Sequence, residues 1–226
     1  DELKSDREIV LTAVENDGYA LKYASGRLKC DREIALTAVK NNGSALQYVS
    51  DELRGNREIV LTALKNNVRC LEYADDELKN DRELVLIEVK ESWEALKYAS
   101  GDLRSDREIV LSAVRQNGSA LQYVSDELRG NREIALTAVT NGRLFVLRQV
   151  SDELKSDREI VLTAVKNDEY ALEYASERLK CDREIVLAAV KHSGVAFKYA
   201  GDELKSDREI VLTAVENDGY ALKYAS

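Results

Sequence analysis

Apolar residues recur along this chain with helical spacing, inside a phrase that repeats every 25 residues. In the first copy, Ile9, Val10, Ala13 and Val14 fall on one face of a helix, whereas polar residues such as Thr12 fall on the opposite face. An Asp or Asn precedes this stripe in every copy, and its side chain can accept hydrogen bonds from the free amides of a helix start. The pattern therefore predicts a first helix of about ten residues in each copy.

A second helix is expected after a tight turn. Capping residues recur at the position of Asp17, often with Gly next, and mark that turn. Beyond it, Leu21, Ala24 and Leu28 continue the helical spacing. Because Leu28 already belongs to the next copy, the second helix should run unbroken across the seam between copies and stop near Cys30.

Nine copies fill the 226 residues. They are marked by an Arg-Glu pair that recurs every 25 residues, with one step of 26, and that begins at Arg7, Arg32, Arg57, Arg82, Arg107, Arg132, Arg158, Arg183 and Arg208. One 25-residue unit is too small to be stable alone, so neighbouring copies must stack. We therefore predict an all-α fold, an α-solenoid of nine tandem two-helix repeats that forms one continuous array over residues 1–226. The repeats are numbered 1 to 9 in chain order.

The two ends of the chain are identical. Residues 1–25 and 202–226 have the same sequence, and the chain opens with Asp1 rather than Met. Three explanations remain open: a fragment of a longer array, ends that pack head to tail with another molecule, or an engineered sequence.

Composition and charge exclude several classes of protein. The chain is 44% apolar and 33% charged, which is too hydrophobic for a disordered chain. Its net charge of −9 argues against a nucleic-acid partner and against an anionic membrane surface. No apolar run approaches the ~20 residues of a membrane span, so we expect no membrane insertion.

No chemistry-bearing cluster stands out. His192 is the only His, and there is no Gly-rich phosphate loop, so we predict no catalytic residue, no metal ligand and no cofactor. Cys70 stands where other copies have Ala and should be a core residue. Cys30 and Cys181 are six copies apart, about 60 Å in a straight stack, which is too far for a disulfide. Cysteine usage favours a reducing intracellular compartment.

The repeating phrase also carries a family resemblance. Asp-Arg-Glu-Ile-Val-Leu-Thr-Ala-Val, then Asn-Gly and Ala-Leu-x-Tyr-Ala-Ser, resembles a tandem-repeat family catalogued as a domain of unknown function, number 4116. The resemblance covers all nine copies, although the copy at 126–151 departs from it by one extra residue. It implies helical tandem repeats and supplies no known activity.

Two copies differ most from the rest. Repeat 4 has Glu88 where a core Ala is normal, and it holds Trp93, the only Trp. Repeat 6 has the extra residue and loses the recurring Tyr. Because Trp and Arg often dominate interfaces, these copies supply the candidate partner-binding residues Trp93, Arg143, Phe145 and Arg148. Arg69, Glu72 and Lys97 are added as variable side chains expected to be exposed on the same surface. The alternative is drift in a tolerant array, with Phe145 filling the gap that the insertion leaves.

Two further rows of residues have structural interpretations. The recurring tyrosines are expected to pack between adjacent repeats, with base or ligand stacking as the alternative. The Arg-Glu row is expected to form a salt-bridge ladder between repeats. We therefore expect a non-catalytic protein-protein interaction scaffold whose partner is unknown. The alternative is a structural subunit of a larger assembly, which includes an end-to-end homo-oligomer.

Overall fold

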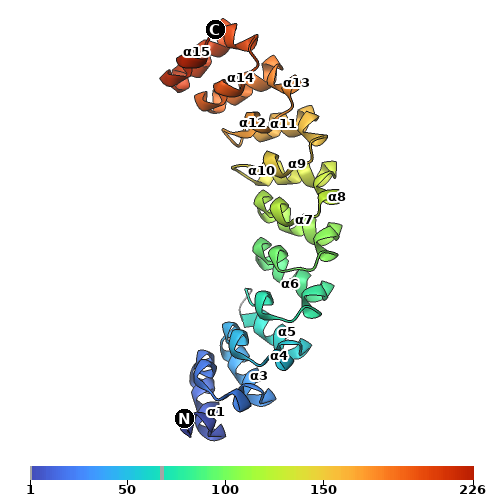
Figure 1. The fold of residues 1–226 in the computed structure, drawn as a ribbon, viewed down its shortest axis with the longest axis vertical. Helices are drawn as coiled ribbons and strands as arrows, with labels where there is room; N and C mark the ends of the chain where they lie inside the picture. The colour runs from blue at the N-terminus through green and yellow to red at the C-terminus, as the bar shows by residue number, and fades with distance from the viewer. Residues whose placement is uncertain (1, 67–68) are drawn as a thin grey trace. The chain divides into compact units, whose positions relative to one another are not determined.

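The computed structural model describes residues 2–66 and 69–226, and each repeat contains a short opening helical segment, a long helix and a second short segment (Figure 1). In the described residues the long helices are α1 (Arg7–Asn16), α3 (Arg32–Asn41), α5 (Arg57–Asn66), α6 (Arg82–Glu91), α7 (Arg107–Gln116), α9 (Arg132–Asn141), α11 (Arg158–Val165), α14 (Arg183–His192) and α15 (Arg208–Asn217). The long helix of every repeat confirms the first-helix prediction.

The second segment of each repeat is usually a 3-10 helix. These segments are η2 (Gly18–Tyr23), η3 (Gly43–Tyr48), η4 (Leu71–Tyr73), η6 (Trp93–Lys97), η8 (Gly118–Tyr123), α10 (Val146–Gln149), α12 (Ala171–Tyr174), η10 (Gly194–Tyr199) and η12 (Gly219–Tyr224). The short opening segments of the repeats are η1 (Leu3–Ser5), α2 (Gly26–Lys29), α4 (Asp51–Arg54), η5 (Leu78–Asn80), η7 (Leu103–Ser105), α8 (Asp126–Arg129), η9 (Leu154–Ser156), α13 (Glu177–Lys180) and η11 (Leu204–Ser206).

The prediction that the second helix runs unbroken across the seam is wrong. Ala24 and Ser25 are extended, with φ and ψ of −65° and 155° and of −63° and 155°, and they separate η2 from α2. The break frees the Ser25 N–H, which donates to the Lys4 carbonyl of the preceding short segment at 2.9 Å. The same bond recurs from Ser50 to Lys29 at 3.1 Å. In a continuous helix these N–H groups would donate to carbonyl groups of the same helix. Here they donate instead to the preceding opening segment.

The predicted caps hold the long helices in place. Asp31 Oδ1 accepts hydrogen bonds from the backbone N–H groups of Glu33 and Ile34, at 3.0 and 3.2 Å. Asp17 caps the following segment, because its Oδ1 accepts from the Tyr19 N–H at 2.9 Å. Side chains therefore satisfy amides that a helix start would otherwise leave without a partner.

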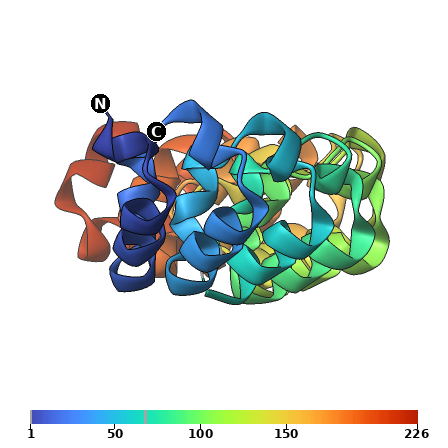
Figure 2. The same cartoon turned by 90° about the horizontal axis from the view of Figure 1, so that it is seen from below.

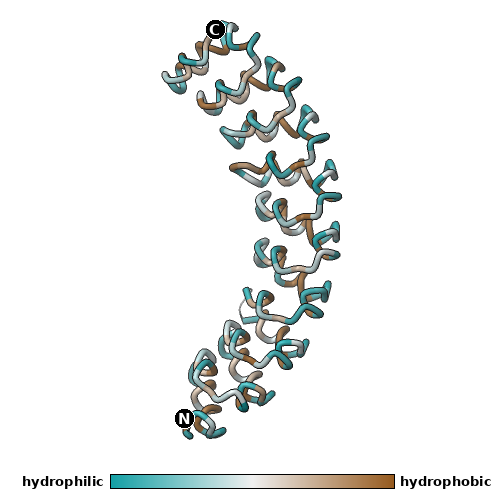
Figure 3. The backbone as a smooth tube through the Cα atoms, viewed as in Figure 1, coloured by the Kyte–Doolittle hydropathy of each residue, from teal (hydrophilic) through white to brown (hydrophobic). Residues whose placement is uncertain are grey.

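The core lies between successive long helices and the segments that follow them. Ile34, Ala38 and Val39 of α3 and Leu46 of η3 are fully buried, which confirms the predicted apolar stripe. In the first unit α1, α3 and α5 pack side by side (Figures 1 and 2). Hydrophobic positions recur in every repeat when the backbone is coloured by hydropathy (Figure 3). The chain is therefore an all-α repeat solenoid, as predicted.

Two compact units make up the chain, residues 1–112 and 113–226. The division falls inside α7 (Arg107–Gln116) and not in a loop. Both units contain the same three-segment repeat. That residues 1–226 form one continuous array stays a prediction. Across the described ranges, no helix has the length and apolar character needed to cross a membrane.

Candidate partner-binding surfaces

An arginine ladder links successive repeats and confirms the predicted salt bridges. Arg82 of repeat 4 donates from Nε to Asp106 Oδ2 at 2.8 Å and also pairs with Glu108. The other oxygen of Asp106 caps α7 by accepting from Ile109 N–H at 3.1 Å. The hydrogen bond from Arg82 lowers the pKa of Asp106 below its usual value, although burial opposes this. Because these groups are partly exposed, each pair should contribute little to stability, and the ladder mainly fixes the register of the repeats.

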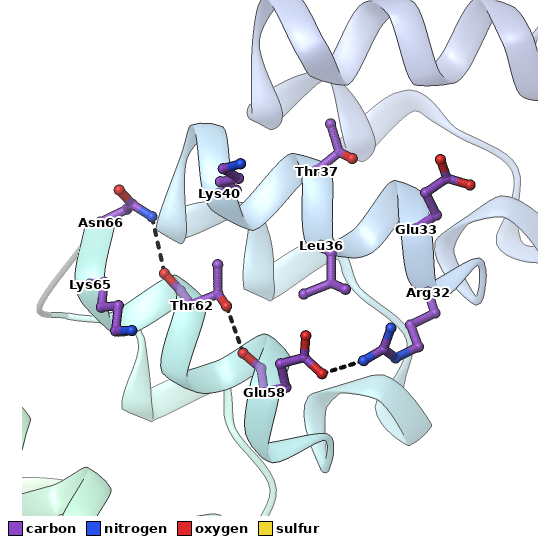
Figure 4. A pocket seen from close by; sticks show the side chains of 9 residues that line it. All are labelled: Arg32, Glu33, Leu36, Thr37, Lys40, Glu58, Thr62, Lys65 and Asn66. Carbon is purple, nitrogen blue, oxygen red and sulfur yellow. Dashed lines mark hydrogen bonds and ion pairs between the residues drawn. The ribbon is translucent and has the colours of Figure 1, made fainter.

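The ladder lines a groove between α3 and α5. The groove has a volume of about 910 Å³, and Figure 4 shows Arg32 reaching across it to Glu58. Asn56 stands where most repeats have the capping Asp, so Arg32 pairs with Glu58 and not with a second carboxylate there. The groove is lined by Arg32, Glu33, Leu36, Thr37, Lys40, Glu58, Thr62, Lys65 and Asn66. Its positive and negative charges nearly cancel, so it favours no charged ligand.

Repeat 6 contains the clearest surface feature, an exposed apolar turn. Phe145 has a φ of 64° and is the single non-glycine residue with a positive φ in the described part of the chain. Its ring stacks on Tyr170 of repeat 7, with centroids 5.3 Å apart and planes 16° apart. Tyr174 meets the same ring edge-on at 6.4 Å. Leu144 and Phe145 remain 52% and 41% exposed. We call Leu144, Phe145, Tyr170 and Tyr174 the Phe145 cluster.

A buried carboxylate holds this turn. Asp168 is 3% exposed, and its Oδ2 accepts from the Phe145 N–H at 2.7 Å. Its Oδ1 accepts from the Tyr170 N–H at 2.9 Å. Burial raises the pKa of Asp168, and these two hydrogen bonds oppose that rise. Sequence reasoning recognised Asp168 only as a cap, since nothing in the sequence distinguishes it from the other capping residues.

The extra residue of repeat 6 is absorbed in the turn and not in the core. Val146 and Leu147, rather than Phe145, occupy the buried positions, at 4% and 1% exposure. Gln149 stands in α10 where other repeats carry the recurring Tyr. Arg143 and Arg148 are both exposed and flank Phe145 in the sequence. Arg143, Phe145 and Arg148 are therefore all exposed within the stretch 143–148 of repeat 6.

The other four candidates lie in the first unit, on repeats 3 and 4. Arg69 pairs with Glu94, the residue after Trp93, at 3.1 Å. Trp93 itself is partly buried at the start of η6. The Lys97 ammonium lies 5.2 Å from the centre of the Tyr98 ring. Glu72 is partly exposed in η4. The single set predicted from the sequence thus comes from two separate units of the chain.

The Glu88 carboxylate of repeat 4 is buried, as expected from its repeat position, which Ala occupies in the other copies. Glu88 is 1% exposed, and its Oε2 has no hydrogen-bond partner in the described structure. Burial raises the pKa of Glu88 to about 8, the nearby Glu72 charge adds to the rise, and a hydrogen bond from the Leu71 N–H opposes it. Cys70, which is also near Glu88, is fully buried, as predicted for a small core residue. Cys30, Cys70 and Cys181 are all free thiols.

The first tyrosines pack between repeats. Tyr19 of repeat 1 meets Tyr48 of repeat 2 edge-on, with ring centroids 4.9 Å apart. Burial, together with a hydrogen bond to Tyr19, raises the pKa of Tyr48 to about 12. This pair confirms the packing interpretation of the row for repeats 1 and 2. Where side chains are described, no group of three His, Cys, Asp or Glu residues gathers in a metal-binding arrangement.

The stacked three-segment repeats define the protein as an all-α tandem-repeat solenoid. The family described as "Domain of unknown function (DUF4116)" matches residues 6–54, 56–104, 106–155, 141–180 and 182–226. The chain belongs to this family. Most of these matches span two of the 25-residue repeats, and two of them overlap at 141–155, which is where repeat 6 carries its extra residue. No curated protein and no solved structure matches the chain.

Proposed function

We propose that this protein is a non-catalytic scaffold that binds a partner protein through the Phe145 cluster. The observation that carries the proposal is an exposed Leu144-Phe145 turn held by the buried Asp168. Apolar side chains that protrude from a fixed backbone lose little freedom on binding, so the surface is preorganised for association. Large aromatic side chains are also the ones that most often dominate interface energies.

The chemistry of the cluster indicates what the partner presents. Phe145, Tyr170 and Tyr174 offer ring faces and edges to an apolar side chain. Arg143 and Arg148, which are exposed and close to Phe145 in the sequence, can pair with carboxylates. We therefore propose a partner segment with an apolar side chain next to acidic residues. Arg69, Glu72, Trp93 and Lys97 stay candidates for a second contact.

Replacing Phe145 by Ser should abolish capture of that partner. The test is a comparison of proteins captured from the native source by immobilised wild-type protein and by Phe145→Ser, measured by quantitative mass spectrometry. Loss of at least about 2 kcal/mol of binding free energy, roughly thirtyfold, is expected for an aromatic residue at the centre of an interface. Leu222→Ser is the control, because Leu222 is another exposed apolar residue, 64% exposed against 41% for Phe145, in a different repeat.

The result can contradict the proposal in two ways. A protein captured equally by the wild type and by Phe145→Ser does not use the cluster. A protein lost with both Phe145→Ser and Leu222→Ser binds through general surface hydrophobicity. Circular dichroism of each variant, matched to that of the wild type, separates loss of contact from loss of fold.

A second candidate function, head-to-tail assembly of copies, is favoured by the identity of repeats 1 and 9. The same residue is exposed on one and covered on the other: Ile9 is 47% exposed, and its counterpart Ile210 is fully buried. Conversely Leu21 is fully buried, and its counterpart Leu222 is 64% exposed. Each face of this 25-residue unit therefore packs on a neighbouring repeat in one of its two copies.

Arg208→Glu should weaken that assembly. Arg7 pairs with Asp31 and Glu33 of the next repeat, and Arg208 would meet Asp6 and Glu8 of a second copy in the same way. Sedimentation of residues 1–226 over a concentration series should show the mass of the wild type increasing with concentration and that of Arg208→Glu increasing much less. A wild type that stays monomeric, or a variant that assembles equally well, would refute this candidate.

A further inference from the structure

Arg104 of the first unit lacks the carboxylate that accompanies the matching cation in most repeats. The opening segment of most repeats pairs a Lys or Arg with an acid three residues earlier, as in Arg129 with Asp126 at 3.2 Å and Lys155 with Asp152 at 2.7 Å. In repeat 5 the acid is replaced by Gly101. Arg104 instead donates from Nε to the Ala99 carbonyl at 2.9 Å, which leaves its other guanidinium donors available.

This arginine lines a small cationic pocket at the junction of repeats 4 and 5. The pocket has a volume of about 370 Å³ and is lined by Asp76, Lys79, Lys97, Tyr98, Ala99, Ser100 and Arg104. Three of these side chains are cationic and one is anionic. The anionic one, Asp76, already contacts Lys79 at 3.4 Å and has a fully exposed side chain. The pocket therefore carries a local positive charge on a chain whose net charge is −9.

We propose that this pocket binds a phosphoryl group. A phosphate dianion offers several acceptor oxygens, which match the forked donors of Arg104 and the ammonium groups of Lys79 and Lys97. The volume exceeds that of a phosphate ion, so the pocket also admits the side chain that carries the phosphate. Tyr98 supplies an aromatic wall for it. The site is separate from the Phe145 cluster and does not depend on the function proposed for that cluster.

Repeat 8 provides an internal comparison, because it has the same cations with both acids present. Lys198 lies 4.4 Å from the centre of the Tyr199 ring, as Lys97 lies beside Tyr98. At the positions that match Lys79 and Arg104, however, the cations are paired with acids, Lys180 with Glu177 at 2.8 Å and Lys205 with Asp202 at 3.1 Å. The charges there largely cancel, so phosphate should bind more weakly at repeat 8 than at the pocket with glycine at position 101.

Repeats 1 and 2 come closest to the same arrangement. Gly26 again stands where most repeats carry an acid, and Lys22 and Lys29 match Lys97 and Arg104. Lys29, however, offers a single ammonium group where Arg104 offers the forked donors of a guanidinium. Binding there should therefore be weaker than at the Arg104 pocket.

The test uses calorimetric titration of the whole chain with phenyl phosphate and with inorganic phosphate, at about pH 7.5, where both are mainly dianions. Gly101→Asp should weaken binding roughly tenfold, because it adds a carboxylate that pairs with Arg104 and removes no cation. The substitution should be compatible with the fold, since nothing lies within 4 Å of a Cβ at Gly101. Lys97→Gln should weaken binding by a similar factor.

Lys198→Gln is the matched control and should leave binding unchanged, because it removes the same charge from the paired site in repeat 8. Tighter binding of phenyl phosphate than of inorganic phosphate would identify a phosphorylated side chain as the ligand, whereas equal binding would identify the phosphate group alone. The proposal is overturned if the wild type binds neither probe, if Gly101→Asp binds as the wild type does, or if Lys198→Gln weakens binding as much as Lys97→Gln.

Discussion

Raising the pH from about 5 to about 9 should lower the free energy of unfolding of the first unit, and Glu88→Gln should abolish this decrease. The folded protein raises the pKa of Glu88 to about 8, because the carboxyl group is buried with one oxygen unpartnered. In the unfolded chain the same group titrates near 4.5. Its protonated form therefore favours the folded state, so this contribution is full below the unfolded pKa and is lost as the pH rises through 8.

The expected size is large for one side chain. A difference of several pKa units corresponds to about 3–5 kcal/mol between the extremes of pH. Gln has nearly the same volume as Glu and cannot ionise. The free energy of unfolding of Glu88→Gln should therefore equal that of the wild type at low pH and exceed it by several kcal/mol at high pH. Burial raises the pKa of the neighbouring Cys70 as well, so that thiol stays neutral over the range.

The measurement is urea unfolding followed by fluorescence of Trp93, the only Trp, which lies five residues from Glu88. Glu91→Gln is the control, because Glu91 is on the same helix and exposed. A difference between Glu88→Gln and the wild type that does not grow with pH would show that the carboxyl group is not buried in the manner described. The capping Asp106, whose pKa Arg82 lowers, titrates below this pH range, so its contribution to stability stays constant in the experiment.

Gly18→Ala should strongly destabilise the first unit, whereas the same change at Gly219 should not affect stability adversely. A Cβ on Gly18 would lie 2.1 Å from the backbone carbonyl oxygen of Ala38 in the next repeat. A backbone carbonyl cannot relieve this clash by changing rotamer as a side chain can, so the two repeats must move apart. We expect a loss of about 2–4 kcal/mol in the free energy of unfolding.

Gly219 is a stringent control because it has the same place in an identical 25-residue sequence. Nothing lies within 4 Å of its Cβ position. Since the described glycines have no positive φ, Gly219→Ala should be neutral or stabilise by up to about 1 kcal/mol. Amide hydrogen exchange measured over α1 and α3, and separately over α15, can follow the two variants. Equal effects at Gly18 and Gly219 would contradict the close approach of repeats as the reason for glycine.

The fold could be predicted in large part because its signals are local. The capping Asp31, the stripe of Ile34, Ala38 and Val39, and the 25-residue period all lie within one repeat or recur in the next. The burial of Cys70 and Glu88 also followed from position alone, because every other repeat supplies a reference for what stands there. The candidate binding residues were found only as departures from that reference, and their function stays a proposal.

What the sequence by itself determined is the repeat, the first helix with its caps and buried face, and the family. The tertiary structure decided the rest through contacts between residues in different repeats. Ser25 leaves the helix to bond Lys4 in the preceding opening segment, and Asp168 fixes Phe145 from 23 residues away. The stacking of neighbouring repeats determines these partners. A local pattern of polar and apolar residues cannot show which residues of two repeats come within hydrogen-bond distance.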